Sequence, residues 1–557
     1  MITWIPVTRG LRWALMALLL GLIAVPAAGA PKGRDELGSR TFLRMSQSVG
    51  IRYYIQHPDQ APGRLAERLS AASRLAAASG LAASGHAGTS RGPGDVVGDV
   101  FNGDDLGLPQ NEESVTACRS DPNIVLEGTN DYRGFLDPKG NFTGWHFSND
   151  GGRSLTNEGL LPPVPMQGQQ VESGGDPIMV ADDDCNLYAA DLNYDAVPDG
   201  DFLPNGVGVY KTDAETLAEC PGGTDPTCWP VRKAAAVAQA DNVFLDKPWI
   251  YVGNSGGETV VWVVYAEFTF PPDDFFGLPF TNLIKAVRCD ADLVSCTKPI
   301  TISRPKNPSI QFGDVTIGPD GRTYITWEED NDLKNNFEPP ENMKFYLRVA
   351  PPGSTKFGPP RLIAREPLNL GFAILHANDF RIATYPKNEV GLVKGEPRVF
   401  LTWEGCAARP LDVVCEEPEI KLRYSDDLGK TWSETKVLSA GGDNYFPSIS
   451  YDQAESKLAV TWFTNRYDPV FHNRQDVELA TVSTSGEVIK RQRLTPESNE
   501  SESDPILGGF FIGDYIEVFA HDGDAWVGYN ANYRSVQLLG EGFPIPQQDN
   551  YLEKVKL

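Results

Sequence analysis

A regular repeat, with a period close to 65 residues, is the feature that most limits how this chain can fold. Seven short apolar segments, often opening with Asp or Pro, begin 64, 71, 66, 66, 66 and 67 residues apart. They are ESVTAC (113–118), PIMVAD (177–182), PWIYVG (248–253), DVTIGP (314–319), FRIATY (380–385), FPSISY (446–451) and GDYIEV (513–518). Such a fixed period is typical of a repeat architecture.

Each unit continues with a turn and a second apolar strand, as in TVVWVVYAEF (259–268) and KLAVTWFTNR (457–466). A third strand follows in most units, and commonly a fourth. Units of this size with three or four antiparallel strands are typical of propeller blades. The sequence therefore predicts an all-β propeller over residues 113–557. We expect seven blades, or six if the first or last unit only closes the ring; two packed sandwiches are the competing architecture.

The N-terminal region predicts export. Arg9 and Arg12 precede the 13 apolar residues WALMALLLGLIAV (13–25) and a small-residue stretch, a pattern typical of a secretory signal peptide over residues 1–30. An uncleaved anchor is the alternative, but the run is shorter than the roughly 20 residues of a membrane span. We expect a secreted or periplasmic protein without membrane insertion. Residues 31–112 include an Ala, Ser and Gly-rich stretch (64–95) and are predicted to be low-complexity and largely disordered.

Charge and cysteine content agree with an extracellular role. Lys and Arg total 49 against 75 Asp and Glu, and the formal net charge of -26 argues against nucleic acid or an anionic membrane as partner. Six of the eight cysteines form three close pairs, and an even count in an exported chain predicts disulfides. The pairs are Cys220 with Cys228, Cys289 with Cys296, and Cys406 with Cys415, which leaves Cys118 and Cys185.

Two third strands end in the same turn motif. SNDGGRSL (148–155) and SDDLGKTW (425–432) both fit Ser-x-Asp-x-Gly-x-x followed by Trp or another apolar residue. Ser and Asp side chains bond turn backbone, Gly supplies a positive φ, and the apolar residue packs into the blade. This motif is the Asp-box, and residues 113–557 resemble the sialidase-like (Asp-box, or BNR-repeat) propellers, as an exported bacterial member. The resemblance implies the propeller fold, and in that family the box itself is structural.

The box also orients the propeller. Because strands alternate in direction and the box joins strands three and four, the turn between strands one and two lies on the same face. Second strands then end on the opposite face, where sialidase-like proteins keep their active sites. Cys118 and Cys185 fall on the box face of adjacent blades, so we expect them to pair.

Charged residues are predicted to converge where the second strands end. Blades six, seven and one are neighbours in a closed ring, and each supplies an arginine at this face: Arg466, Arg534 and Arg133. Guanidinium groups pair bidentately with carboxylates, so this trio is predicted to bind an acidic sugar. The first strands add Asp176, Lys247, Asp314, Asp379, Asp514 and Tyr515. The alternative is that such residues are solvated or pair with adjacent loops.

The resemblance implies candidates for catalysis. Sialidases use an arginine triad, a Tyr–Glu nucleophile pair and an Asp acid/base, so Tyr515 is the candidate nucleophile. Asp131, Glu328 and Glu404 are the candidate acid/base carboxylates. The chain departs from the family in two respects. The Phe/Tyr-Arg-x-Pro signature is missing, with the Arg-x-Pro at residues 91–93 in the low-complexity stretch, and seven blades are expected where catalytic sialidases have six.

Two loops on the same face suggest further binding. DLNYDAVPDGD (191–201) offers alternating oxygen ligands, so Asp191 and Asp195 are candidate Ca²⁺ ligands, although the loop lacks the Gly at position six of an EF-hand. No other cofactor is predicted. FTFPPDDFFGLPF (268–280) is either a self-packed cap or an aromatic platform for a sugar or a protein.

Two functions follow from these residues. The first is hydrolysis of an extracellular glycan or glycoprotein carrying an acidic sugar, at the face opposite the Asp-boxes. The second is a non-catalytic propeller that binds glycans or proteins with the same face.

Overall fold

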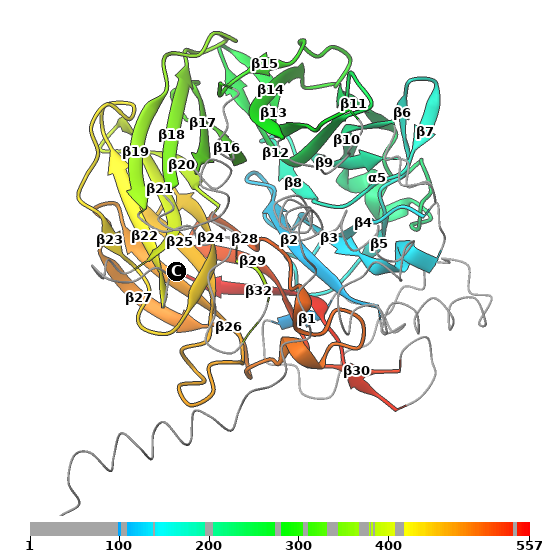
Figure 1. Cartoon of the computed structure of the whole chain (residues 1–557), viewed down its shortest axis with the longest axis vertical. Coiled ribbons are helices and arrows are strands. Elements are labelled where there is room, and N and C mark those ends of the chain that lie inside the picture. Colours follow the sequence, from blue (N-terminus) through cyan, green and yellow to red (C-terminus); the bar gives the residue numbers. More distant parts are fainter. Residues whose placement is uncertain are drawn as a thin grey trace, which may run out of the picture.

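The protein is a seven-bladed β-propeller (Figure 1). The computed structural model describes residues 108–136, 140–194, 204–272, 280–304, 310–330, 343–366, 378, 380–382, 385–406, 417–537 and 543–557, together with the backbone of 99–101. The predicted signal peptide, nearly all of the low-complexity segment, Asp195, Asp379, Cys415 and residues 273–279 of the Phe-rich loop lie outside the described residues. Within the described part, no helix has the length and apolar character needed to cross a membrane.

The described residues form seven four-stranded antiparallel sheets, each one blade. From the inner to the outer strand, blades 1 to 3 are β2 (Gln110–Ala117), β3 (Val125–Asp131), β4 (Thr143–Ser148) and β5 (Asn157–Leu160); β8 (Ile178–Ala181), β9 (Asn186–Tyr194), β10 (Asn205–Asp213) and β11 (Val231–Val237); β12 (Val243–Ser255), β13 (Glu258–Thr269), β14 (Thr281–Asp290) and β15 (Ile300–Thr301). Blades 4 to 6 are β16 (Ile310–Ile317), β17 (Thr323–Glu329), β18 (Met343–Ala350) and β19 (Arg361–Glu366); β20 (Lys387–Val393), β21 (Glu396–Cys406), β22 (Pro418–Ser425) and β23 (Lys436–Val437); β24 (Asn444–Asp452), β25 (Lys457–Thr464), β26 (Asp476–Ser483) and β27 (Val488–Arg493). Blade 7 is β28 (Glu517–His521), β29 (Asp524–Ala531), β32 (Asp549–Lys556) and β1 (Asp99–Phe101).

Blade 7 closes the ring with strands from both ends of the described chain. β1 pairs antiparallel with β32, so the outer strand of the last blade precedes the first blade in sequence. β1 and the start of β2 lie ahead of residue 113, where the sequence places the beginning of the propeller. Neighbouring inner strands contact one another around the whole ring, including β2 with β28.

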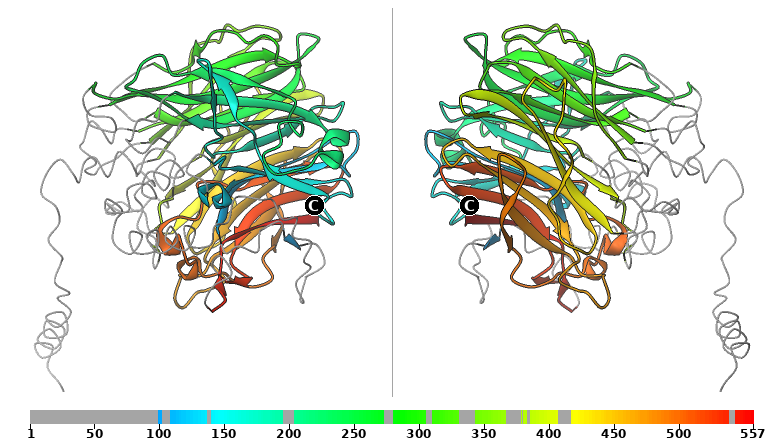
Figure 2. Two further views of the ribbon diagram at one scale, coloured as in Figure 1. Left: turned by 90° about the vertical axis from the view of Figure 1, so that its right-hand side faces the viewer. Right: turned by 90° about the vertical axis from the view of Figure 1, so that its left-hand side faces the viewer.

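Little of the described chain lies outside the blades, as the side views of Figure 2 show. The additional elements are the hairpins β6 (Val164–Met166)–β7 (Gln169–Val171) and β30 (Ser535–Val536)–β31 (Ile545–Pro546), the helix α5 (Ala214–Glu219), and the 3₁₀ turns η1 (Tyr132–Leu136), η2 (Ser501–Ser503) and η3 (Gly508–Phe510). The core lies between the blades, where second-strand tryptophans such as Trp262, Trp403 and Trp462 are fully buried.

One expected inner strand is wrong. Phe380–Ile382 and Tyr385 are not in a strand, and blade 5 begins instead with β20, Lys387–Val393. The apolar residues of this segment, Phe380, Ile382 and Tyr385, are buried in the core although they are not part of a strand. Their pattern therefore indicated burial and not strand pairing. The alternation that pairs with β21 starts only at Lys387.

The two Ser-x-Asp-x-Gly turns have equivalent hydrogen bonds. In blade 5 the N–H groups of Lys430 and Thr431 donate to Asp427 Oδ1 at 2.9 and 2.8 Å, and Gly429 N–H donates to Ser425 Oγ at 2.8 Å. In blade 1, Asp150 and Ser148 accept the corresponding bonds from residues 152–154. The glycines at the fifth position, Gly152 and Gly429, have φ of 82° and 84°. We call the side of the propeller that carries these turns the turn face.

Three predicted disulfides are confirmed: Cys118–Cys185, Cys220–Cys228 and Cys289–Cys296. Cys118–Cys185 links blades 1 and 2 on the turn face. This pairing was predicted because both cysteines were expected on that face of adjacent blades. Cys406 is also disulfide-bonded, while its expected partner Cys415 is outside the described residues. Disulfides persist in oxidising compartments, which indicates an extracellular or periplasmic protein.

The turn hydrogen bonds predict a pH-dependent loss of stability in the Asp427→Asn variant. The Thr431 N–H, and then the Thr431 and Ser425 hydroxyls and the Lys430 N–H, lower the pKa of Asp427 to about 2. A carboxyl whose folded pKa is lowered stabilises the fold above its unfolded pKa and loses that contribution as pH falls through the folded value. We expect the variant to lose about 1–2 kcal/mol at pH 7, a deficit that shrinks between about pH 4 and pH 2.

Denaturant unfolding at several pH values measures this deficit. Asp150→Asn, in the equivalent turn of blade 1, should follow the same pattern. A deficit that is constant down to pH 2 would contradict the assigned role of the carboxylate.

Candidate functional site

A cluster of charged side chains lies on the propeller axis. Lys247 Nζ is 3.2 Å from Glu112 Oε1, 3.3 Å from Asp176 Oδ2 and 2.5 Å from Asp514 Oδ2. Arg381 binds the carboxylate of Asp514 bidentately: its Nε donates to Oδ1 at 2.8 Å and its Nη2 donates to Oδ2. These five residues come from the starts of blades 1, 2, 3, 5 and 7, so their side chains can meet only at the axis. We call them the axial cluster.

The blade repeat explains this convergence. Glu112, Asp176 and Lys247 have φ of 61°, 58° and 50°, and Gly513, just before Asp514, has φ of 92°. Inner-strand pairing also shifts register at this point in blades 1 and 3, between Asn111 and Ser114 and between Asp246 and Trp249. Left-handed backbone at non-glycine residues costs free energy and is frequent at functional sites. Here the conformation recurs at equivalent places, which puts the carboxylates of different blades around a single ammonium.

Burial and charge separate the protonation states of the cluster. Burial, then Asp176, raises the pKa of Glu112 well above its usual range, against the opposing charge of Lys247. Burial alone would raise the pKa of Asp514, but Arg381 and Lys247 outweigh it and hold that pKa below its usual range. Burial disfavours the charged form of Lys247, yet Asp176, Asp514 and Glu112 raise its pKa. The cluster therefore holds two carboxyls whose pKa values are shifted in opposite directions around the same cation.

An aromatic layer closes the channel next to the axial cluster. The rings of Trp249, Tyr385 and Tyr515 pack together with centroids 5.4–6.0 Å apart. They come from blades 3, 5 and 7 and are at most 5% exposed. Lys247 lies on the side where the inner strands begin, and Lys387, two residues after Tyr385, lies on the side of the turn face. The layer thus divides the axis into two separate environments.

The turn-face side of the layer is a cavity of about 890 Å³. Inner strands and their turns line it, with Lys387, Asp314 and Glu517 at its inner end and exposed residues such as Asp183 and Asp184 at its rim. Burial lowers the pKa of Lys387 to about 7, against the opposing charges of Asp314 and Glu517. Burial also raises the pKa of Glu517 to about 7, and Lys387 opposes this shift.

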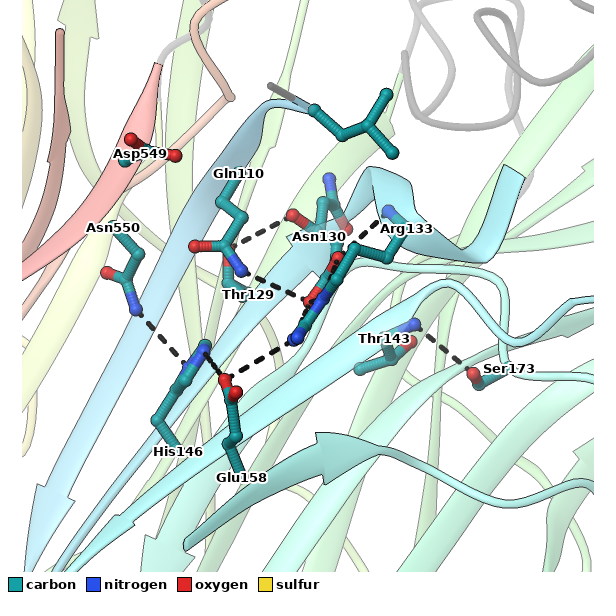
Figure 3. Close-up of polar contacts among 12 residues, drawn as sticks. Gln110, Thr129, Asn130, Arg133, Thr143, His146, Glu158, Ser173, Asp549 and Asn550 are labelled. Atoms are coloured by element: carbon teal, nitrogen blue, oxygen red, sulfur yellow. Dashed lines mark hydrogen bonds and ion pairs between the residues drawn. The ribbon is translucent and has the colours of Figure 1, made fainter. Parts of the chain in front are cut away.

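A second buried ion network surrounds Arg133 in blade 1 (Figure 3). Arg133 follows β3 in the turn η1 and bonds the carboxylate of Asp131, with Nε 2.8 Å from Oδ2, and its Nη2 is 3.5 Å from Glu158 Oε2. His146 Nε2 lies 3.6 Å from the same Glu158 oxygen. Burial would raise the pKa of Asp131, but the charge and hydrogen bonds of Arg133 lower it. Both predicted residues are therefore paired with each other.

The other predicted arginines lie in their own blades. Arg466 Nη1 is 2.9 Å from Glu478 Oε1 in blade 6, and its guanidinium lies over the Tyr467 ring. The backbone carbonyl of Arg534 accepts a hydrogen bond from Gln547 N–H at 3.0 Å. Among the described contacts none joins the three arginines, so their joint binding of an acidic group stays a prediction. Arg466 is the more accessible, with a side chain 29% exposed against 9% for Arg133.

The predicted catalytic residues lie in different surroundings. Tyr515 belongs to the aromatic layer, where its hydroxyl donates to Pro177 O at 2.9 Å, and burial raises its pKa well above the usual range. Glu404 accepts a hydrogen bond from Phe446 N–H at 2.8 Å and ties blade 5 to blade 6. Glu328 is buried in β17. Their catalytic roles, like that of Asp131, stay predictions.

The calcium prediction also stays open. Asp191 is buried in β9 and accepts a hydrogen bond from Thr143 Oγ1 at 2.9 Å, and burial raises its pKa well above the usual range. A raised pKa opposes the ionised form that Ca²⁺ binding needs. Within the described residues, no group of three or more His, Cys, Asp or Glu side chains is arranged to hold a metal ion.

Sequence reasoning found part of the axial cluster. The first-strand starts predict Asp176, Lys247 and Asp514 on this face, and all three are there. Glu112 was missed because the propeller was expected to begin one residue later. Arg381 was missed because its segment was expected to be a strand. Glu112 stands one residue before the repeat boundary, as Asp176 and Lys247 do in their units, which is the signal that could have found it.

Comparison with known proteins supplies structural likenesses only. No protein-family model and no curated protein matches the sequence. Similar solved structures include a protein of unknown function from Dyadobacter fermentans DSM 18053, with 11% identity over 83% of this chain and 98% of that one, and a TM-score of 0.42. The Hadza microbial sialidase Hz136 is also similar, with 10% identity over 84% of this chain and 95% of that one, and a TM-score of 0.41. The polysaccharide lyase Uly1 has 10% identity over 84% of this chain and 94% of that one, and a TM-score of 0.41. Similarity at this level says nothing about activity.

The axial cluster predicts a large stability loss for Lys247→Met. Removing the ammonium leaves three buried carboxyls with Arg381 as the remaining cation of the cluster, and breaking a buried ion pair costs about 3–5 kcal/mol. The loss should be smaller at pH 5 than at pH 8, because protonation relieves the uncompensated carboxylates. Denaturant unfolding measures both values, and Lys490→Met at an exposed site is the control, expected within about 0.5 kcal/mol of the parent. A Lys247→Met variant as stable as its control would contradict the ion pairing.

Proposed function

We propose that this propeller is exported and hydrolyses extracellular glycans at the end of the axis opposite the turn face. The hydrogen bonds of the Ser148 and Ser425 turns support the interpretation of these turns as Asp-boxes, and hence a place among the sialidase-like propellers. The axial cluster would supply the groups that carry out the reaction.

The observation that carries the proposal is that Glu112 and Asp514 contact the same ammonium while their pKa values are shifted in opposite directions. Environments that push the pKa values of two neighbouring carboxyls apart mark the acid and the base of a site. Glu112, whose pKa is raised by burial and by Asp176, would donate a proton to the glycosidic oxygen. Asp514, kept ionised by Arg381 and Lys247, would face the anomeric carbon.

The spacing of the two groups favours retention of configuration. Glu112 Oε1 and Asp514 Oδ2 contact the same Lys247 nitrogen at 3.2 and 2.5 Å. The two oxygens are therefore closer together than the carboxyl groups of an inverting pair. Those groups stand roughly 6.5–9.5 Å apart, because a water molecule must fit between the base and the sugar. A retaining reaction passes through a covalent glycosyl-enzyme, here on Asp514.

Arginines on the same face support an acidic substrate. Arg381 already engages one carboxylate bidentately, and Arg466 stands in blade 6 with about a third of its side chain accessible. Arg466, with Arg133 and Arg534, stays our candidate for the sugar carboxylate. A substrate must enter from the side where the inner strands begin, because the aromatic layer blocks the other.

A non-catalytic glycan- or protein-binding propeller is the second candidate. It is favoured by the complete burial of Lys247 and Asp514 and by the pairing of Arg133 and Arg466 with carboxylates of their own blades. In that case the axial cluster serves only to hold the blades together.

Sugar release from a panel of sialosides, uronides and neutral glycans, with and without Ca²⁺, tests the proposal. We expect the parent to release an acidic sugar and Glu112→Gln and Asp514→Asn to lose about 10²–10⁴-fold in kcat, the usual contribution of acid–base catalysis. Glu487→Gln, an exposed carboxylate on the outer part of blade 6, is the matched control and should keep full activity. No release from any substrate, together with glycan binding by the parent, would establish the second candidate instead.

Arg466→Ala tests the recognition of the acidic group separately. Loss of one charged hydrogen-bonding partner should raise KM for acidic substrates about 10-fold and leave kcat nearly unchanged. Steady-state kinetics on an acidic sugar and on its methyl ester separate the two effects, since only the charged substrate should discriminate parent from variant. An equal rise in KM for the acidic sugar and for its methyl ester would show that Arg466 stabilises the segment after β25 and does not contact the substrate.

A further inference from the structure

A buried lysine, Lys387, lines the cavity at the other end of the axis. We propose that Lys387 is an amine nucleophile that captures a neutral carbonyl compound, an aldehyde of the size of a short reducing sugar, as an imine in the turn-face cavity. The site shares no residue with the axial cluster, and the aromatic layer separates the two, so the proposal is independent of the glycan hydrolysis proposed above.

The geometry around Lys387 is that of a poised amine. Its side chain lines the cavity, is 3% exposed, and its Nζ has no hydrogen-bond partner among the described residues. Nζ lies 2.6 Å from the centroid of the Trp249 ring and 4.2 Å from that of Tyr385. Removal of a lysine from water favours the uncharged amine, whereas the faces of the two rings favour the ammonium, so the contacts oppose each other at Nζ.

Three charged groups from other blades act on Lys387: Asp314, Glu517 and, beyond the aromatic layer, Lys247. Asp314 on β16 and Glu517 on β28 favour its protonated form, whereas burial and the neighbouring cation Lys247 oppose it. Their balance puts the pKa of Lys387 near 7. About half of the amine is then free at neutral pH, against about one part in 3,000 for an ordinary lysine.

The walls of the cavity select the ligand. Two cationic residues, Arg119 and Lys387, line it, whereas its acidic residues are Asp182, Asp183, Asp184, Asp314, Asp320, Glu389 and Glu517. This excess of carboxylates repels an anion such as a keto acid or a phosphate. It leaves an uncharged carbonyl compound as the electrophile that the amine can meet. A cavity of about 890 Å³ is large enough for a sugar-sized molecule.

The chemistry balances with groups already present. The lone pair of Nζ adds to the carbonyl carbon, an N–C bond forms, and the carbonyl electron pair moves to the oxygen, which takes up a proton. Loss of water then breaks the C–O bond and leaves the C=N bond of the imine. Glu517, half-buried at the same end of the cavity with a pKa of about 7, is placed to supply and take back protons.

Reductive trapping in the intact parent protein tests the proposal. The protein is incubated with glyceraldehyde and cyanoborohydride between pH 6 and pH 10, digested, and the lysine-containing peptides are quantified by mass spectrometry. We expect Lys387 to be modified at least 10-fold faster at pH 7 than Lys394, an exposed lysine at the other end of β20, with a half-maximal rate near pH 7. Pyruvate in place of glyceraldehyde should label Lys387 at least 10-fold more slowly.

The comparison within one protein does not depend on a folded variant. Lys387→Met should abolish the fast label, Lys394→Met should leave it unchanged, and Glu517→Gln should slow it several-fold without removing it. Modification of Lys387 at or below the rate of Lys394, or with the pH dependence of an ordinary lysine, would overturn the proposal. Faster labelling by pyruvate than by glyceraldehyde would overturn the choice of a neutral ligand.

Discussion

The contact of one buried ammonium with three carboxylates holds the centre of this propeller. Lys247 joins the starts of blades 1, 2, 3 and 7, and Arg381 brings in the segment that leads to blade 5. A ring of seven sheets must place its inner strands side by side around an axis. Side chains of these strands that point toward the axis are therefore removed from water. Buried charges are stable only when they are paired, so the cluster constrains the blades and fixes protonation at the same time.

The repeat made the architecture predictable but not its centre. Period, strand alternation and the two turn motifs were sufficient to predict seven blades, the orientation of the strands and the Cys118–Cys185 disulfide. They also predicted Asp176, Lys247 and Asp514 at one face. What they could not predict is pairing across blades, because a 65-residue pattern says nothing about which side chains of different repeats meet. Arg381 shows the limit: its apolar neighbours signal burial, and only the fold shows that it reaches Asp514.

The aromatic layer gives the two ends of the axis different chemistry. On one side cations outweigh desolvation and keep Asp514 ionised; on the other, desolvation outweighs two nearby carboxylates and brings the pKa of Lys387 to about 7. Residues only two positions apart along an inner strand, such as Lys247 and Trp249, belong to different environments. Substrate access to the proposed hydrolytic centre is therefore expected from one face of the propeller only.

The central claim is that the axial cluster contacts the sugar. A crystal structure of the Glu112→Gln variant soaked with the acidic glycan that the parent cleaves tests it most directly. Our account predicts the sugar ring between residue 112 and Asp514, with its carboxylate facing the arginines of the same face. A glycan bound on the outer strands or in the turn-face cavity, with the axial cluster unchanged and sealed, would contradict it.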